Sequence, residues 1–234
     1  MRVRIARQAF LNYLCVSVNY FSHYYFDHLQ GEDLHNYGLV LPDFVRNFAK
    51  TKLKASALVA NEEHAMLSRG TEKHFKRDHV FHGSAWFKEA EEQLNRRLQP
   101  LFKAQDIARY WFAAHLLSEM MVDRILMKRH PEMLDRFYRD LVDADYGTVQ
   151  SFLEVNGVKD VAGFKDRFVR FTESQYLRQY EHNTALVYSL NRIYIFTGAG
   201  TEWSATQHRA LEDAVPHIEE EIEMGLPTLM EEMI

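Results

Sequence analysis

Two segments of the chain each carry three potential metal ligands spaced four residues apart. Their ligand-type side chains are His74, Asp78 and His82 in the first segment, and His115, Glu119 and Asp123 in the second. Positions i, i+4 and i+8 fall within roughly 80° of one face of an α-helix. The spacing therefore predicts two helices that each present three imidazole or carboxylate groups on one side. Such groups on two facing helices are typical ligands of a divalent metal ion.

The composition of the chain favours helix over strand. Ten glycines and five prolines in 234 residues are too few for an architecture with many tight hairpin turns. Leu, Ala, Glu, Arg, Lys and Met, which are strong helix formers, are plentiful. No internal repeat and no Pro/Gly/Ser-rich linker divides the sequence. We therefore expect one all-α domain, a multi-helix bundle that spans residues 1–234.

Apolar periodicity, capping residues and helix-breaking residues predict the individual helices. The predicted helical segments are 19–30, 34–49, 61–83, 84–99, 104–129, 132–155, 161–180, 182–198 and 205–226. Asn61 is expected to cap its helix, and Pro100 is expected to end the segment before it. Gly70 lies inside a predicted helix, where a glycine often allows a bend or the close approach of another backbone. A kink is possible before Pro216.

Charge and cysteine content restrict the compartment and the partners. A formal net charge of −5 argues against a protein that coats nucleic acid. The single Cys15 forms no internal disulfide, which is consistent with a reducing cytoplasm. The N-terminal apolar run is broken by Asn12, Tyr13 and Ser17, unlike that of a signal peptide, and no apolar run reaches the length of a membrane span. We expect a cytoplasmic protein that binds neither nucleic acid nor a membrane.

The second triple lies in the apolar segment 104–129, where carboxylates are costly to bury unless they are paired or bound to a metal. Exposure on a polar stripe, or pairing with nearby basic residues, is the alternative. The first triple lies in a more polar segment, so a solvated helix face is its alternative. One helix supplies too few ligands for a closed site, whereas two facing helices supply enough and leave positions open for water.

The sequence lacks the common motifs of other hydrolases and nucleotide-binding proteins. It contains no GxSxG, no Walker loop, no GxGxxG and no HExxH. Basic side chains recur in segments 46–54, 69–77 and 96–97. Each run fits a solvated face, and together they also fit a docking surface for an anionic substrate or an acidic protein.

Five short motifs follow one another in a distinctive order. They are NYFSH, which ends at His23; GLVLPDFVR, with Asp43; GTEKHFKRD, with His74 and Asp78; SEMMVDRILMKRHPE, with Glu119 and Asp123; and SLNRIY, with Arg192. This order resembles the acyl carrier protein phosphodiesterase family, a divergent, all-helical branch of the HD-type metal-dependent phosphohydrolases. The resemblance runs from about residue 19 to about residue 220, so it implies an HD-like bundle with residues 1–18 as an N-terminal extension.

The chain departs from the family pattern at three positions. His82 replaces an acid, Glu119 replaces an aspartate, and Arg124 replaces the histidine that follows the second acid. These differences bear on the substrate more than on the fold.

The resemblance implies that metal-bound water hydrolyses the phosphodiester between 4′-phosphopantetheine and a serine of acyl carrier protein, an acidic partner, with Mn²⁺ or Mg²⁺ as cofactor. It implies metal ligands, or residues that orient them, among Asp43, His74, Asp78, Asp123, Glu119 and His82. It implies catalytic roles for His23, Asp78, His115 and Arg192, and substrate contacts for Arg77, Lys73 and Arg46.

Two other functions remain open from the residues. The same fold could be a metal-binding or protein-interaction module without hydrolase activity. A carboxylate-bridged di-metal bundle would need Glu-x-x-His pairs from two helices, and the two segments with the triples have none. The sequence does not indicate an oligomeric state.

Overall fold

The computed structural model describes residues 19–233, and this part of the chain is built from helices. They are α2 (Tyr20–Asp27), α3 (Asp33–Gly38), α4 (Leu41–Ala49), α5 (Glu62–Gly83), α6 (Ala85–Ala104), α7 (Tyr110–Arg129), α8 (Pro131–Asp143), α9 (Tyr146–Val155), α10 (Val161–Glu173), the 3-10 helix η1 (Tyr176–Glu181), α11 (Asn183–Phe196) and α12 (Ala205–Met233). No strand occurs between residues 19 and 233, so the predicted all-α class is confirmed.

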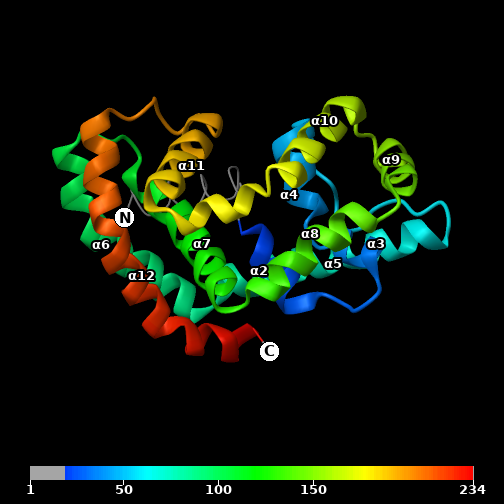
Figure 1. Ribbon diagram of the computed structural model, residues 1–234, viewed down its shortest axis with the longest axis horizontal. Helices are drawn as coiled ribbons and strands as arrows, with labels where there is room; N and C mark the ends of the chain where they lie inside the picture. The colour runs from blue at the N-terminus through cyan, green and yellow to red at the C-terminus, as the bar shows by residue number, and fades with distance from the viewer. Residues whose placement is uncertain (1–18, 234) are drawn as a thin grey trace, which may run out of the picture.

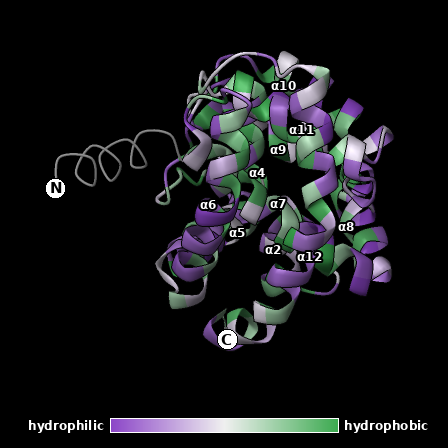
Figure 2. Ribbon diagram, turned by 90° about the vertical axis from the view of Figure 1, so that its left-hand side faces the viewer, coloured by the Kyte–Doolittle hydropathy of each residue, from purple (hydrophilic) through white to green (hydrophobic). Residues whose placement is uncertain are grey.

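The central helix of the bundle is α7. All its residues from 112 to 127 are buried, and it packs against α2, α6, α8, α11 and α12 (Figure 1). One connected cluster of buried hydrophobic side chains extends from α2 to α12, and hydrophilic residues lie mostly on the outer helix faces (Figure 2). None of the described helices combines the length and the apolar character that a membrane crossing requires. The ligand-type residues of α7 therefore lie inside the bundle.

A pair of glycines sets the crossing of α3 and α5. A Cβ atom on Gly70 would lie 2.8 Å from Gly38 Cα and would overlap the carbonyl oxygen of His35. Only glycine at both positions lets the two backbones approach so closely. The close approach predicted at Gly70 is confirmed. The crossing also brings the Leu39 carbonyl oxygen within 2.8 Å of His74 Nδ1, so the glycines help to place a candidate ligand.

Several predicted helix ends differ from the structure. Helix α6 continues through Pro100 to Ala104, because Leu98 and Phe102, one turn apart, are both buried against the core. Helix α12 likewise continues through Pro216 to Met233. In both helices, the packing of buried apolar side chains outweighs the hydrogen bond that a proline removes.

Three predicted segments are each divided in two. Segment 34–49 forms α3 and α4, segment 132–155 forms α8 and α9, and segment 161–180 forms α10 and η1. At the second division, Asp145 caps α9 by accepting a hydrogen bond from the backbone N–H of Thr148 at 2.8 Å. The N-cap predicted at Asn61 is present, since its side chain accepts from His64 N at 2.7 Å.

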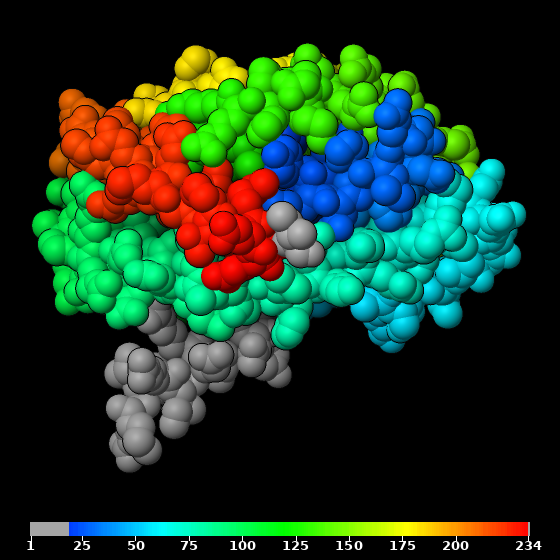
Figure 3. Space-filling model, turned by 90° about the horizontal axis from the view of Figure 1, so that it is seen from below, coloured from blue at the N-terminus to red at the C-terminus, as the bar shows by residue number. Residues whose placement is uncertain are grey.

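The last turns of α12 lie on the junction of α5 and α6 (Figure 3). The Arg77 guanidinium donates to the Met233 carbonyl oxygen, and the Glu232 carboxylate accepts from Ala85 N at 2.8 Å. The C-terminal helix therefore fixes the end of α5 that carries the first ligand triple.

Candidate metal centre

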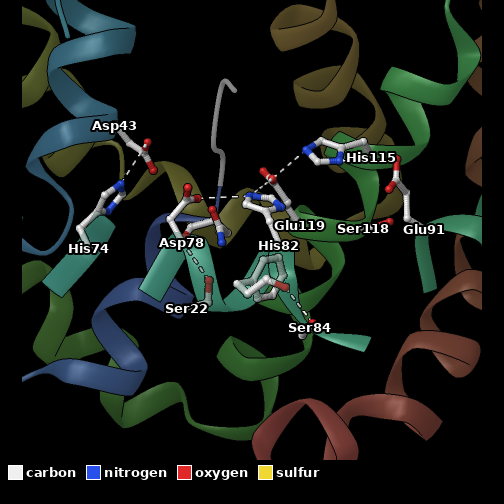
Figure 4. A network of polar contacts seen from close by, with 12 residues as sticks. Ser22, Asp43, His74, Asp78, His82, Ser84, Glu91, His115, Ser118 and Glu119 are labelled. Atoms are coloured by element: carbon white, nitrogen blue, oxygen red, sulfur yellow. Dashed lines mark hydrogen bonds and ion pairs between the residues drawn. The ribbon is translucent and has the colours of Figure 1, made fainter. Parts of the chain in front are cut away.

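Four helices bring ligand-type side chains together in two groups. The His23 group consists of His23 on α2, Asp43 on α4 and His74 on α5; the His115 group consists of His82 on α5 and of His115 and Glu119 on α7. Within each group, one ligand atom from each residue lies within 4.8 Å of the others. Figure 4 shows Asp43 and His74 on one side of Asp78, and His82, Glu119 and His115 on the other. The two predicted triples therefore meet only in part: His82 of α5 joins His115 and Glu119 of α7, whereas His74 lies in the other group.

In the His23 group, His74 is oriented by the protein backbone. Its Nδ1 lies 2.8 Å from the Leu39 carbonyl oxygen. A carbonyl only accepts hydrogen bonds, so Nδ1 carries the proton of the neutral ring and Nε2 carries the lone pair. That Nε2 lies 3.7 Å from Asp43 Oδ1. A backbone carbonyl that fixes the tautomer in this way is typical of a metal-binding histidine.

His23 is the most unusual residue of the group. Its side chain is 1% exposed, and neither ring nitrogen has a hydrogen-bond partner in the described part of the chain. Its ring centroid lies 4.0 Å from that of His74. Burial, together with His74, holds the pKa of His23 well below its usual range, so the ring is neutral. A buried neutral imidazole without a partner costs about 1–3 kcal/mol, which a metal ion would offset.

Asp43 completes the His23 group and lies in the first turn of α4. Both of its carboxylate oxygens are buried without a hydrogen bond among residues 19–233. Burial raises the pKa of Asp43, although the neighbouring His74 and the charge of Arg46 oppose the shift. On the same helix, the Nε and Nη1 atoms of Arg46 are also buried, and neither has a hydrogen-bond partner among residues 19–233. The protein thus places a half-buried arginine beside the group.

In the His115 group, Glu119 joins two histidines. Its Oε1 lies 3.1 Å from His115 Nε2 and 3.3 Å from His82 Nε2. Glu91 on α6 lies on the far side, 3.8 Å from His115 Nδ1. Burial alone would lower the pKa of His115, but Glu119 and Glu91 outweigh it and raise that pKa to about 10. His115 therefore carries an additional proton, which a metal ion bound to this imidazole would have to displace.

Asp78 lies between the two groups. Its Oδ1 is 3.2 Å from His82 Nε2. Burial would raise the pKa of Asp78, but the hydrogen-bonding contact with His82 and the charge of His82 hold it below its usual range. The carboxylate is therefore ionised and faces imidazoles from both groups.

Asp123, the last residue of the second triple, lies outside both groups. Its two oxygens accept hydrogen bonds from the backbone N–H groups of Phe21, at 2.9 Å, and Ser22, at 2.7 Å. Burial raises the pKa of Asp123 to about 8, although these hydrogen bonds oppose the shift. Asp123 thus holds the first turn of α2, the helix that carries His23.

The predicted basic residues are distributed differently. Arg77 Nε and Nη2 bind the Asp27 carboxylate at 2.6 and 2.7 Å, and Lys73 lies 3.7 Å from the same carboxylate. Arg192 lines a separate cavity of about 540 Å³ beside η1 and α11. Two of the four basic residues singled out in the sequence act on the His23 group: the charge of Arg46 opposes the rise in the pKa of Asp43, and the charge of Arg77 adds to the lowering of the pKa of His23.

One contact of the centre has no signal in the sequence. Glu91 lies on α6, outside both triples and all five motifs, and it reaches His115 only because α6 packs on α7.

No family model matches the chain, and no match is found among curated proteins or among solved structures.

Proposed function

We propose that the protein is a metal-dependent phosphodiester hydrolase with an HD-like bundle. The observation that carries this proposal is the His23 group, in which two buried imidazoles and a buried carboxylate from three helices converge. A divalent ion held there would lower the pKa of a bound water and polarise a phosphoryl oxygen. Imidazole ligands favour Mn²⁺ over Mg²⁺, which prefers oxygen ligands.

The side chains around the ion would bind either the cation or the phosphoryl group. His23, Asp43 and His74 would hold the cation, and the Leu39 carbonyl keeps His74 in the tautomer that can bind it. Arg46 would bind the non-bridging phosphoryl oxygens, because its buried Nε and Nη1 have no other described partner and an arginine fork fits such oxygens. The positive side chain would also offset the charge of the diester near Asp43.

For the substrate, we propose the phosphodiester between 4′-phosphopantetheine and a serine of an acyl carrier protein. Three of the motifs that resemble the acyl carrier protein phosphodiesterase family supply the three residues of the His23 group. Carrier proteins are acidic, and one hollow on the surface of α5 is lined by Arg69, Lys73 and Lys76 together with a single acid, Glu72. Such a basic surface would attract an acidic partner.

The test is release of 4′-phosphopantetheine from holo-acyl carrier protein by the Mn²⁺-loaded protein, followed by the mass of the carrier protein. His74→Gln should abolish release. His64→Gln is the matched control, because His64 is a buried histidine of the same helix whose Nε2 is bound to Ser151 Oγ at 2.7 Å. If the wild-type protein cleaves neither holo-carrier protein nor bis(p-nitrophenyl) phosphate, the hydrolase proposal fails and a non-catalytic metal-binding module replaces it.

A further inference from the structure

We infer that the centre holds two divalent cations, one in the His23 group and one in the His115 group, with Asp78 between them. This inference builds on the metal site of the proposed function. It adds a second ion, which would be bound by His82, His115 and Glu119. The ligand pattern is His-x-x-x-Asp-x-x-x-His on α5, not the Glu-x-x-His pairs of carboxylate-bridged bundles.

Each group has the size of a single coordination sphere. With ligand distances of about 2.0–2.2 Å, two ligands of one ion lie at most about 4.4 Å apart. The three ligand atoms of each group already lie within 4.8 Å of one another. Small side-chain movements would therefore let one ion contact all three atoms in either group.

A single ion cannot serve both groups. Successive ligand positions on α5 are four residues apart, so His74 and His82 are separated by about 12 Å of helix rise. Their imidazoles also point to different partners: His74 Nε2 is 3.7 Å from Asp43 on α4, and His82 Nε2 is 3.3 Å from Glu119 on α7. The two histidines therefore belong to different coordination spheres.

Asp78 is placed to bridge the two ions. It lies one helical turn from each histidine, and Figure 4 shows its carboxylate between the His74 side and the His82 side of the centre. One oxygen is 3.2 Å from His82 Nε2, and a carboxylate has a second oxygen for a second cation.

The buried charges also fit two cations. Asp43 is 1% exposed and neither of its carboxylate oxygens has a hydrogen bond among residues 19–233, and burial of an uncompensated carboxylate is strongly unfavourable. Four carboxylates belong to the centre, namely Asp43, Asp78, Glu91 and Glu119. Arg46 and the imidazoles offset part of this negative charge, and divalent cations in the two groups would offset the rest.

The test is the number of Mn²⁺ ions that each chain binds after equilibrium dialysis and elemental analysis. Wild-type protein and His64→Gln should bind two, and His74→Gln and His115→Gln should each bind one. Electron paramagnetic resonance should show the signal of an exchange-coupled Mn²⁺ pair in the wild-type protein and of an isolated ion in His115→Gln. Glu119→Gln serves as a second variant of the His115 group, and circular dichroism checks that each variant is folded.

One ion per wild-type chain would overturn the inference, whatever the variants do, and would make the His115 group an ion-pair network. Two ions in folded His115→Gln and Glu119→Gln proteins would also overturn it. The number of bound ions and the cleavage of a diester are independent results, so the two proposals can fail separately. Two ions without cleavage of any diester would leave the two-ion centre and refute the hydrolase, and cleavage with one ion would do the reverse.

Discussion

His82 Nε2 on α5 lies 3.3 Å from Glu119 Oε1 on α7. This contact joins the two helices whose ligand triples are visible in the sequence, and α2 packs against both of them. The centre is therefore held by the same helices that form the middle of the bundle. Loss of a cation from this centre should therefore lower the stability of the folded protein as well as its activity.

Removal of the metal should lower the melting temperature. A cation that binds only the folded protein, at a free concentration a hundredfold above its Kd, stabilises it by about 2.7 kcal/mol. For a chain of this size, that corresponds to about 5–10 °C. Differential scanning calorimetry with Mn²⁺ and with EDTA measures the shift, and Mg²⁺ should give a smaller one. Equal melting temperatures in Mn²⁺ and EDTA would contradict metal binding at the buried groups.

Gly70→Ala should destabilise the protein by about 3 kcal/mol or more, because the new Cβ would overlap the His35 carbonyl oxygen. It should also weaken Mn²⁺ binding, since the crossing at Gly70 positions His74. Gly83→Ala is the matched control on the same helix: its Cβ would meet no atom within 4 Å. Its effect should stay within about 1 kcal/mol. Urea unfolding compares the two, and similar losses would show that the crossing tolerates a side chain.

Asp123→Ala should cost about 2–4 kcal/mol, because two backbone N–H groups of α2 lose their acceptor inside the protein. Asp123→Asn should cost less, since its side-chain oxygen can still accept from one of them. Both variants should bind Mn²⁺ more weakly through misplacement of His23. A Mn²⁺ titration would contradict this account if Asp123→Ala were as stable as wild type but lost one ion per chain, which is the behaviour of a direct ligand.

Arg46→Met should lower kcat/KM for a phosphodiester by about a hundredfold, as expected when a donor to the phosphoryl group is lost. Arg77→Met should leave kcat/KM within about threefold and lower stability by about 1–3 kcal/mol, because its Asp27 partner loses a bidentate ion pair. Steady-state kinetics on bis(p-nitrophenyl) phosphate and urea unfolding separate the two arginines. The reverse pattern would assign phosphoryl binding to Arg77.

Much of the fold and part of the centre could be predicted from the sequence, because both depend on local spacing. The i, i+4 and i+8 pattern places His74, Asp78 and His82 on one face of α5, and the glycine at position 70 signals a close backbone approach. The helix end predicted at Pro100 was wrong, because the buried side chains of Leu98 and Phe102 on either side of it keep α6 continuous.

The remaining features depend on contacts between residues far apart in the sequence. Spacing shows that Asp123 shares a face with Glu119, but it does not show that the start of α2, about 100 residues earlier, occupies both of its oxygens. In the same way, the partner of Arg77 is 50 residues away. Glu91 enters the centre only through the packing of α6 on α7.

The most direct test of the account is a crystal grown with Mn²⁺ and measured at the manganese absorption edge. We predict an anomalous difference peak about 2.2 Å from the ligand atoms of His23, Asp43 and His74, with a second peak between His82, His115 and Glu119. Peaks confined to surface histidines such as His217, or no peak at the His23 group, would contradict the metal centre and the hydrolase proposed from it.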